Sequence, residues 1–351
     1  ALSVAFVLLG LSLYGALMGY VASYVFAAVA SVILVLILTQ RKHSSRNGHS
    51  FKDNLMELVR YGGPLYVSLL LTGFIPLYQN VVLAFFTTDA EIGNYKAATN
   101  FITLITVFSI PITTALLPAF SKFDSSKSRK MIDFFKIANK YTSLVIVPIS
   151  TIMIIFSSTV VQIIYGSTYQ TAPVYLATYS IVYLLAGIGY LTLTSFYNGL
   201  GQTKTTLKMS LITFLTLIVL SPALAQMYSV QGLIAALILA NTTGTSYGAY
   251  KARRDFKIEF STVSLLKIYL ASLLSGFILL LFIQLTQLPA LITVLLGGFL
   301  YIFFYVTLIP LTKAVTIPEL QMVITVTQKI RILANVAKPI FEYQKRILQL
   351  Y

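Results

Sequence analysis

The sequence predicts an all-α fold, a polytopic bundle of transmembrane helices, from three observations. Of the 351 residues, 57% are hydrophobic and only 10% are charged, whereas a soluble domain carries about 25% charged residues. Apolar runs of about 20 residues, the length that crosses a bilayer, follow one another along the chain. Lys and Arg are concentrated in every second gap between these runs. We therefore expect a multi-pass protein of a cell membrane.

The apolar runs define nine full spans and one partial span. The partial span ends near Gly10, and the full spans are 13–39, 62–87, 93–119, 141–164, 173–198, 209–227, 230–250, 264–286 and 289–312. Residues 1–40 carry no charge, and as one helix they would extend about 60 Å, about twice the hydrocarbon thickness. The chain must therefore turn between Gly10 and Gly15. Because the chain opens on Ala1 within an apolar run, we expect that it lacks its N-terminal part.

The positive charge predicts the orientation of the spans. Apart from Lys96, the basic residues, 24 of 25, lie in the segments 41–60, 122–140, 204–208, 251–267 and 313–346. Positively charged loops resist translocation, so these segments mark the cytoplasmic side, and the C-terminus is expected there. The alternative is a wrong number of spans, but one missed or invented helix would disrupt the alternation.

The charged segment 41–60 divides the chain into regions. Residues 1–40 hold the partial span and one full span, and residues 61–312 hold eight spans. Residues 313–351 mix Leu, Ile and Phe with Lys and Arg. This tail is either an amphipathic helix on the cytoplasmic membrane surface, broken near Pro339, or a loosely ordered segment.

Little catalytic chemistry is available in the sequence. The chain has no Cys, and its two histidines, His43 and His49, lie in a charged loop where such residues are solvated. No carboxylate lies in the middle of a span, and no Gly-rich phosphate-binding loop appears. We therefore expect no catalytic residue, no metal site and no cofactor. The net charge of +15 lies in gaps between spans rather than on one face of a soluble fold, so no nucleic-acid partner is expected.

Polar side chains inside the spans are the candidate substrate site. They are Tyr78, Gln79, Asn80, Asn94, Lys96, Asn100, Thr113 and Thr114. Amides in hydrocarbon are costly unless they pair or meet water, so these residues either line a water-filled cavity or form interhelical hydrogen bonds of about 0.6 kcal/mol each. For Lys96 the alternative is a helix-end lysine whose long side chain carries its ammonium to water.

Five motifs then carry a resemblance to a known family. Ile92–Tyr95 is similar to Val-Gly-x-Tyr, Ala115–Lys122 to Leu-Pro-x-x-Ser, Ile164–Tyr169 to Tyr-Gly-x-x-Tyr, Asn198–Lys204 to Gly-Leu-Gly-x-x-Lys, and Tyr228–Gly232 to Tyr-Gly-x-x-Gly with Ser229 in place of the first Gly. The motifs follow one another in the order, with the spacing and on the sides of the membrane that are typical of a polysaccharide-biosynthesis flippase. The chain therefore resembles the C-terminal two-thirds of such a protein. That family lies within the multidrug/oligosaccharidyl-lipid/polysaccharide exporter superfamily.

The resemblance implies two lobes of six helices around a central cavity, often with two further helices. Residues 1–40 would then end an incomplete first lobe, 41–60 would join the lobes, and 61–312 would hold the second lobe and an extra pair at 264–312. It also implies a lipid-linked oligosaccharide or polysaccharide precursor, flipped from the cytoplasmic to the outer leaflet among the membrane lipids, with functional coupling to glycosyltransferases. Lys96 would be the basic residue nearest the lipid phosphate.

Two alternative functions are considered beside the flippase, and the sequence differs at one place from a related branch of the superfamily. A cation-coupled multidrug exporter would share the fold, and a membrane-embedded glycosyltransferase would need a carboxylate near the outer surface, where only Asp89 and Glu91 qualify. Lipid II flippases carry Ala-Asp-Arg near the outer start of the span at 93–119. Here the region reads Ala97-Ala-Thr-Asn100 without charge, which argues against a peptidoglycan precursor.

Overall fold

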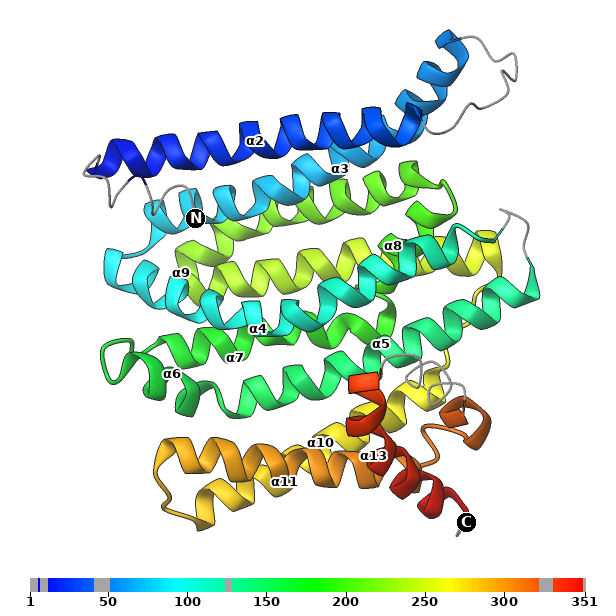
Figure 1. Cartoon of the computed structure of the whole chain (residues 1–351). Coiled ribbons are helices and arrows are strands. Elements are labelled where there is room, and N and C mark those ends of the chain that lie inside the picture. Colours follow the sequence, from blue (N-terminus) through cyan, green and yellow to red (C-terminus); the bar gives the residue numbers. More distant parts are fainter. Residues whose placement is uncertain (1–5, 7–11, 41–50, 124–127, 322–330, 350–351) are drawn as a thin grey trace. The chain divides into compact units, whose positions relative to one another are not determined.

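The computed structural model describes residue 6 and residues 12–40, 51–123, 128–321 and 331–349, and every element within them is a helix (Figure 1). The chain forms two compact units, Ala1–Met56 and Glu57–Tyr351. Apart from residue 6, the partial span expected before Gly10 lies outside the described residues, and so do residues 41–50 of the segment 41–60.

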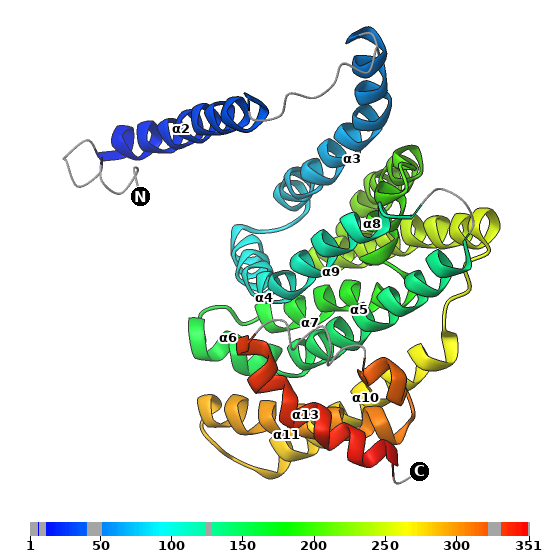
Figure 2. The same ribbon diagram turned by 45° about the vertical axis from the view of Figure 1, so that its right-hand side comes forward.

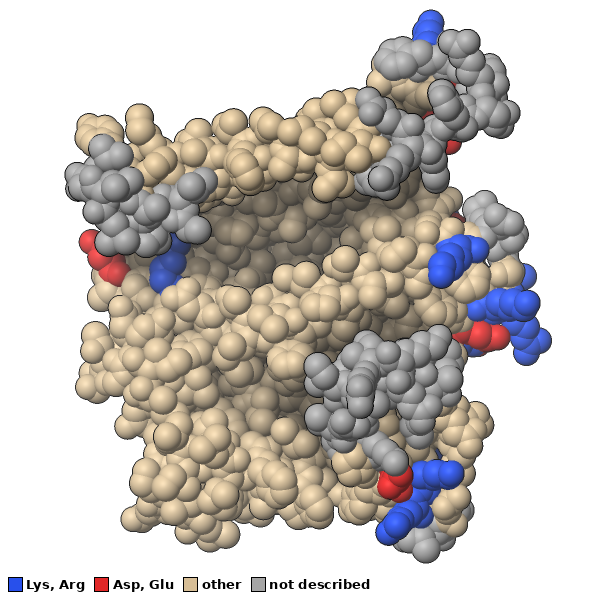
Figure 3. Space-filling model, viewed as in Figure 1, with Lys and Arg blue, Asp and Glu red and all other residues tan. Residues whose placement is uncertain are grey.

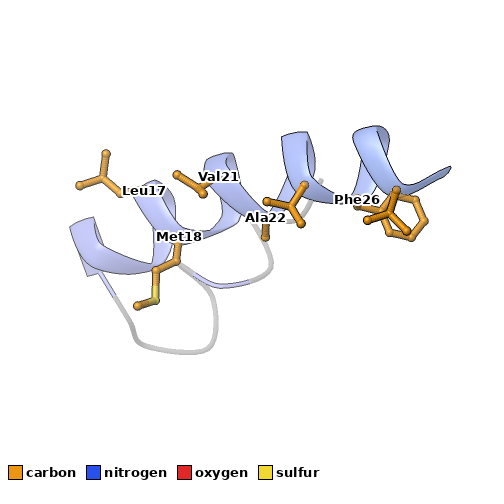
Figure 4. Close-up of a pocket in the computed structure, with 7 residues that line it drawn as sticks. Leu17, Met18, Val21, Ala22 and Phe26 are labelled. Carbon is orange, nitrogen blue, oxygen red and sulfur yellow. The ribbon is translucent and has the colours of Figure 1, made fainter. Parts of the chain in front are cut away.

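The first unit contains α2 (Ser12–Gln40), a 29-residue helix without a charged side chain. Its large apolar side chains are exposed along its length. Figure 4 shows a shallow apolar hollow on this helix, lined by Leu17, Met18, Val21, Ala22, Val25, Phe26 and Val29. Because all lining side chains come from α2 itself and are apolar, this surface suits contact with lipid chains.

The second unit is a bundle of long helices that lie side by side (Figure 2). It begins within α3 (Phe51–Phe86) and continues with α4 (Asp89–Phe120), α5 (Arg129–Ile155), α6 (Ser157–Tyr165), α7 (Ala172–Leu184), the 3-10 helix η2 (Leu185–Ile188), α8 (Thr192–Gly199), α9 (Thr203–Phe256), α10 (Thr262–Leu285), α11 (Ala290–Leu311) and α13 (Arg331–Gln349).

The described helices include all nine apolar runs from which full spans were expected. Seven helices among the described residues are long and apolar enough to cross a membrane, and α7–η2 with α8 form a further pair bent by 46°. The 54-residue α9 contains two segments, because Ser229 interrupts it with φ 52° and ψ −132°; a straight helix of that length would extend about 80 Å. The predicted all-α, polytopic membrane fold is confirmed.

The break between α7 and α8 is built without proline. α3, α4 and α5 continue through Pro76, Pro111 and Pro148, whereas the chain turns at Gly189, whose φ of 96° suits glycine. Neighbouring helices hold the backbone around this turn. The Asn139 side-chain amide on α5 donates to the Gly187 carbonyl at 2.9 Å, and the Tyr269 hydroxyl on α10 donates to the Leu184 carbonyl.

Basic side chains of the second unit gather at one end of the bundle (Figure 3). This is the end where α4 and α11 finish, where α5 and α10 begin, and where α9 both begins and finishes; we call it the basic end. An aromatic cluster packs there, with the ring of Phe196 5.3 Å from that of Phe120 and 5.0 Å from that of Phe135. Lys96 lies near the start of α4, at the opposite end, with Asp89 and Glu91.

Candidate functional site

A cavity of about 790 Å³ lies within the second unit among α3, α4, α8 and α9. Its polar lining is made of hydroxyl and amide side chains: Ser68, Thr72, Thr113, Thr114, Thr194, Ser195, Asn198, Thr206, Ser210, Thr213, Asn241 and Thr245. Tyr190 and apolar residues including Leu69, Leu191 and Met209 complete the wall. Among the described residues that line this cavity, none is charged.

The cavity occupies the half of the bundle next to the basic end. Leu117 and Pro118 line it from the last turn of α4, which ends at Phe120. Asn198 lines it from the end of α8, and Thr206 from the first turn of α9. A solute entering from the basic end would therefore meet this cavity before the apolar centre of the bundle.

Side-chain hydrogen bonds join α3 to the opposite wall. The Ser68 and Ser210 hydroxyl oxygens lie 2.6 Å apart, and the Tyr61 hydroxyl donates to the Asn198 carbonyl at 3.1 Å. Farther along α3, the Tyr78 hydroxyl donates to the Ile218 carbonyl at 3.1 Å. These bonds hold α3 beside α8 and α9.

The cavity is suited to a neutral polyhydroxyl ligand. Serine and threonine hydroxyls each donate one hydrogen bond and accept two. The Thr114 hydroxyl donates to the Ile110 carbonyl of its own helix at 2.8 Å, which leaves its lone pairs to accept from a ligand. A sugar presents donors and acceptors of the same kind together with apolar C–H faces. A phosphate in this cavity would meet no basic side chain among the described lining residues.

Of the eight candidate residues from the sequence, Thr113 and Thr114 line the cavity. Tyr78, Gln79, Asn80, Asn94, Lys96 and Asn100 are not among its lining residues. Gln79 is buried, and its side-chain oxygen accepts a hydrogen bond from Tyr95 at 3.3 Å. Tyr78 and Gln79 thus form interhelical hydrogen bonds, but the buried side-chain nitrogen of Gln79 has no partner among the described residues, and Asn80 is half-buried.

Asn94 and Glu91 join the starts of α4 and α7. The Asn94 side-chain oxygen accepts from the backbone amides of Thr171 and Ala172, both at 3.1 Å, at the start of α7. Glu91 accepts from the Thr171 hydroxyl at 3.0 Å and from the Tyr175 hydroxyl. The junction between the starts of α4 and α7 thus lies between two of the motifs, Ile92–Tyr95 and Ile164–Tyr169. Glu91 contributes hydrogen bonds that hold this junction together.

Lys96 and Asn100 lie on the exposed side of α4. The Asn100 amide donates to the Tyr165 hydroxyl at 3.2 Å. None of the ion pairs found among the described residues includes Lys96. Its side chain is accordingly available to a ligand at the end of the bundle opposite the cavity.

The two motifs at the basic end also meet. A Cβ added at Gly199 would lie 2.6 Å from the Phe120 Cβ and 2.8 Å from the Leu117 carbonyl oxygen. The Gly-Leu-Gly turn therefore packs directly on the Leu-Pro-x-x-Ser end of α4. At the opposite end, a Cβ at Gly232 would lie 1.9 Å from the Leu224 carbonyl oxygen, so the two segments of α9 also touch through glycine.

Ten of the twelve polar lining residues were missed by the sequence reasoning. Most are single Ser or Thr residues, which are common in membrane helices and carry no distinctive spacing. One signal was present: Asn241-Thr-Thr-Gly-Thr245 is a polar run inside the expected span 230–250, and both of its ends line the cavity.

Comparisons with known proteins agree with the resemblance. Residues 1–124 match the family described as polysaccharide biosynthesis protein, so the match includes the first two motifs and leaves the later three outside it. No curated protein matches the chain. Among solved structures, a lipid II flippase MurJ in an inward closed conformation matches with a TM-score of 0.62 and 19% identity. The match covers 86% of this chain and 65% of the flippase, so the chain spans less than two-thirds of that protein's length.

The two matches support one another, because the sequence match lies in the N-terminal third and the structural match extends over most of the chain. The structural match shows a shared polytopic helical fold. Residues 1–124 are thus similar to the polysaccharide biosynthesis protein family, and most of the chain shares the polytopic helical fold of the matched flippase structure.

Proposed function

We propose that this protein flips a lipid-linked oligosaccharide or polysaccharide precursor from the cytoplasmic to the outer leaflet. The single observation that carries this proposal is the neutral, hydroxyl-lined cavity inside an apolar bundle. A hydrophilic glycan cannot cross about 30 Å of hydrocarbon without a polar path. The cavity supplies hydrogen-bond partners for sugar hydroxyls within one half of that distance.

In this mechanism the C-terminal unit binds the sugars and the lipid chain stays in the bilayer. The lining hydroxyls replace the water that the glycan loses, and the helices exclude the isoprenoid chain from the cavity. The lipid phosphate is bound elsewhere, because the described lining residues are uncharged. Lys96 is our candidate for a phosphate contact on the far side of the bundle.

The positive-inside rule supports the direction of transport. Lys and Arg of the second unit gather at the basic end, which supports a cytoplasmic position for that end and for the C-terminus in this proposal. The cavity then lies in the cytoplasmic half, where lipid-linked glycans are available to an inward-facing transporter. The proposal includes functional coupling to the glycosyltransferases that would supply such lipids.

The two rival functions receive less support from the site. A cation-coupled drug exporter would use a carboxylate in its binding cavity, and the described cavity residues include none. A glycosyltransferase would need a free carboxylate near the outer surface, and Glu91 is hydrogen-bonded to Thr171 and Tyr175. A transporter rather than an enzyme is therefore the better account.

A flipping assay in proteoliposomes tests the proposal. The full-length gene product is reconstituted with a fluorescent lipid-linked oligosaccharide of neutral sugars, and the outward-moved fraction is measured by a membrane-impermeant lectin. Lectin-accessible glycan should increase with protein and stay at background in empty vesicles. Glycan transport that stays at background, together with efflux of cationic drugs, would contradict the proposal and support a multidrug exporter.

A further inference from the structure

The C-terminal helix α13 lies against the membrane-spanning helix α11 (Figures 1 and 2). The Gln344 amide donates to the Val306 carbonyl at 3.2 Å. The Tyr343 and Thr307 hydroxyl oxygens lie 3.1 Å apart. These contacts fix the described side chains of α13 to the outside of the bundle.

The contact lies near the basic end of the membrane-spanning helix α11. Thr307 precedes the end of α11 at Leu311 by four residues, and Phe303, whose ring centroid lies 6.4 Å from that of Tyr343, precedes it by eight. At 1.5 Å per residue these positions lie about 6 and 12 Å inside the basic end of α11. An interfacial helix sits at a similar depth, with its apolar face about 5–10 Å into the boundary between head groups and acyl chains.

The two sides of α13 differ in chemistry. Phe341 and Leu348 are partly buried against the core formed by α10 and α11. Lys345 and Arg346 are exposed. Over its whole length the sequence of α13 has four basic residues, Arg331, Lys338, Lys345 and Arg346, and one acidic residue, Glu342. A helix that docks through apolar residues at interface depth and presents net positive charge outward complements an anionic lipid surface.

We infer that α13 binds the head groups of anionic phospholipids in the leaflet at the basic end, with Lys345 and Arg346 contacting the lipid phosphates. This inference is independent of what the transporter carries. Each basic side chain near an anionic surface adds to the attraction, and the attraction is screened by salt. The occupant is a lipid head group, since the exposed side chains of the neighbouring span α11, among them Ile302 and Phe303, are apolar and suit contact with lipid.

A tryptophan reporter tests the inference, because the chain contains no Trp. Ile347→Trp places the reporter on α13, and Phe299→Trp places a reference in the middle of α11, where the native side chain is 73% exposed. In bilayers with phosphatidylglycerol, the Ile347→Trp protein should be quenched most by lipids brominated near the head group. The Phe299→Trp protein should be quenched most by lipids brominated near the chain ends, whatever the head group.

Charge removal provides the decisive comparison. In the Ile347→Trp protein, Lys345→Gln with Arg346→Gln should raise the concentration of short-chain phosphatidylglycerol that half-saturates the fluorescence change, by roughly fivefold for each charge removed. The matched control, Lys204→Gln with Lys208→Gln, removes two exposed charges from the start of α9 and should leave that concentration unchanged. Equal responses to phosphatidylglycerol and phosphatidylcholine, or an α13 reporter shielded from both kinds of brominated lipid, would overturn the inference.

Discussion

Gly199 and Phe120 are in direct backbone-level contact: a Cβ at Gly199 would stand 2.6 Å from the Phe120 Cβ. Contacts this close exclude any side chain, and overpacking of this kind costs about 1–3 kcal/mol. The contact joins the end of α8 to the end of α4, next to the cavity residues Leu117 and Asn198. The position of the cavity wall therefore depends on a glycine.

Gly199→Ala should lower the melting temperature of the purified protein in detergent, measured by fluorescence-detected size exclusion after heating. The matched control is Gly298→Ala on α11, where an added Cβ would meet nothing within 4 Å. Alanine has the higher helix propensity by about 1 kcal/mol, so the control should be neutral or stabilising. Equal melting temperatures for the two variants would contradict the close contact.

Ser229 adopts a backbone conformation that glycine prefers, with φ 52° and ψ −132° between the two segments of α9. Its hydroxyl donates to the Thr87 hydroxyl at 2.8 Å, which offsets part of the strain. Ser229→Gly loses the hydrogen bond and relieves the strain, whereas Ser229→Ala only loses the bond. We expect Ser229→Gly to be more stable than Ser229→Ala by about 1–2 kcal/mol, and the reverse order would refute the strained turn.

Lys140 and Glu319 form an ion pair between α5 and the segment after α11. The lysine nitrogen lies 2.8 Å from both carboxylate oxygens, and the lysine is 6% exposed. Glu319→Gln would leave a buried ammonium without its counter-charge. Partial solvent access to Glu319 reduces the cost, so we expect a loss of about 2–3 kcal/mol. Lys140→Met should lower the free energy of unfolding by less, because Glu319 keeps its hydrogen bonds from Thr316. Thermal melts of both variants test this order.

The same pair predicts a dependence of stability on pH. Partial burial tends to raise the pKa of Glu319, but hydrogen bonds from Lys140 and Thr316 outweigh it and hold this pKa below its ordinary value of 4.5. A lowered folded-state pKa contributes stability that is present above the ordinary pKa and is lost as pH falls through the folded one. The melting-temperature difference between the native protein and Glu319→Gln should therefore be constant at neutral pH and shrink below about pH 4.5. A difference that stays the same at acidic pH would contradict this.

Lys96→Ala should reduce transport of a lipid-linked glycan without changing the affinity of the cavity for the soluble glycan. Lys96 is exposed near the start of α4 and is not among the cavity residues. Lys204→Ala removes an exposed charge at the basic end and serves as the control. Equal transport by the two variants would remove Lys96 from the proposed phosphate contact.

The sequence was sufficient to predict the long apolar helices, because apolar runs of this length are a direct consequence of the bilayer. It was also sufficient to identify Gly199 and Gly232 within motifs, although only the structure shows which backbones they touch. The break at Gly189 was not predicted. The sequence suggests helix breaks at prolines, whereas this break occurs at a glycine and is held by the side chains of Asn139 and Tyr269 from distant segments.

The cavity was harder to predict for a physical reason. Asn94 and Gln79 look like candidates because amides are rare in hydrocarbon, yet their partners lie elsewhere in the chain, at Thr171 and Tyr95. Thr194 and Ser210 look ordinary, because a hydroxyl can be satisfied by its own helix. Which hydroxyls face a common space depends on how α3, α4, α8 and α9 pack.

The central claim is that the neutral cavity binds the glycan during flipping, and two isosteric changes test it most directly. Thr114→Val with Thr194→Val removes two lining hydroxyls and keeps the volume, and Thr103→Val, on α4 outside the cavity, is the matched control. Each lost hydrogen bond is worth about 1 kcal/mol, so flipping of a neutral lipid-linked oligosaccharide in proteoliposomes should fall by roughly tenfold or more. The control should flip at the native rate; a double variant that also flips at the native rate would contradict the account.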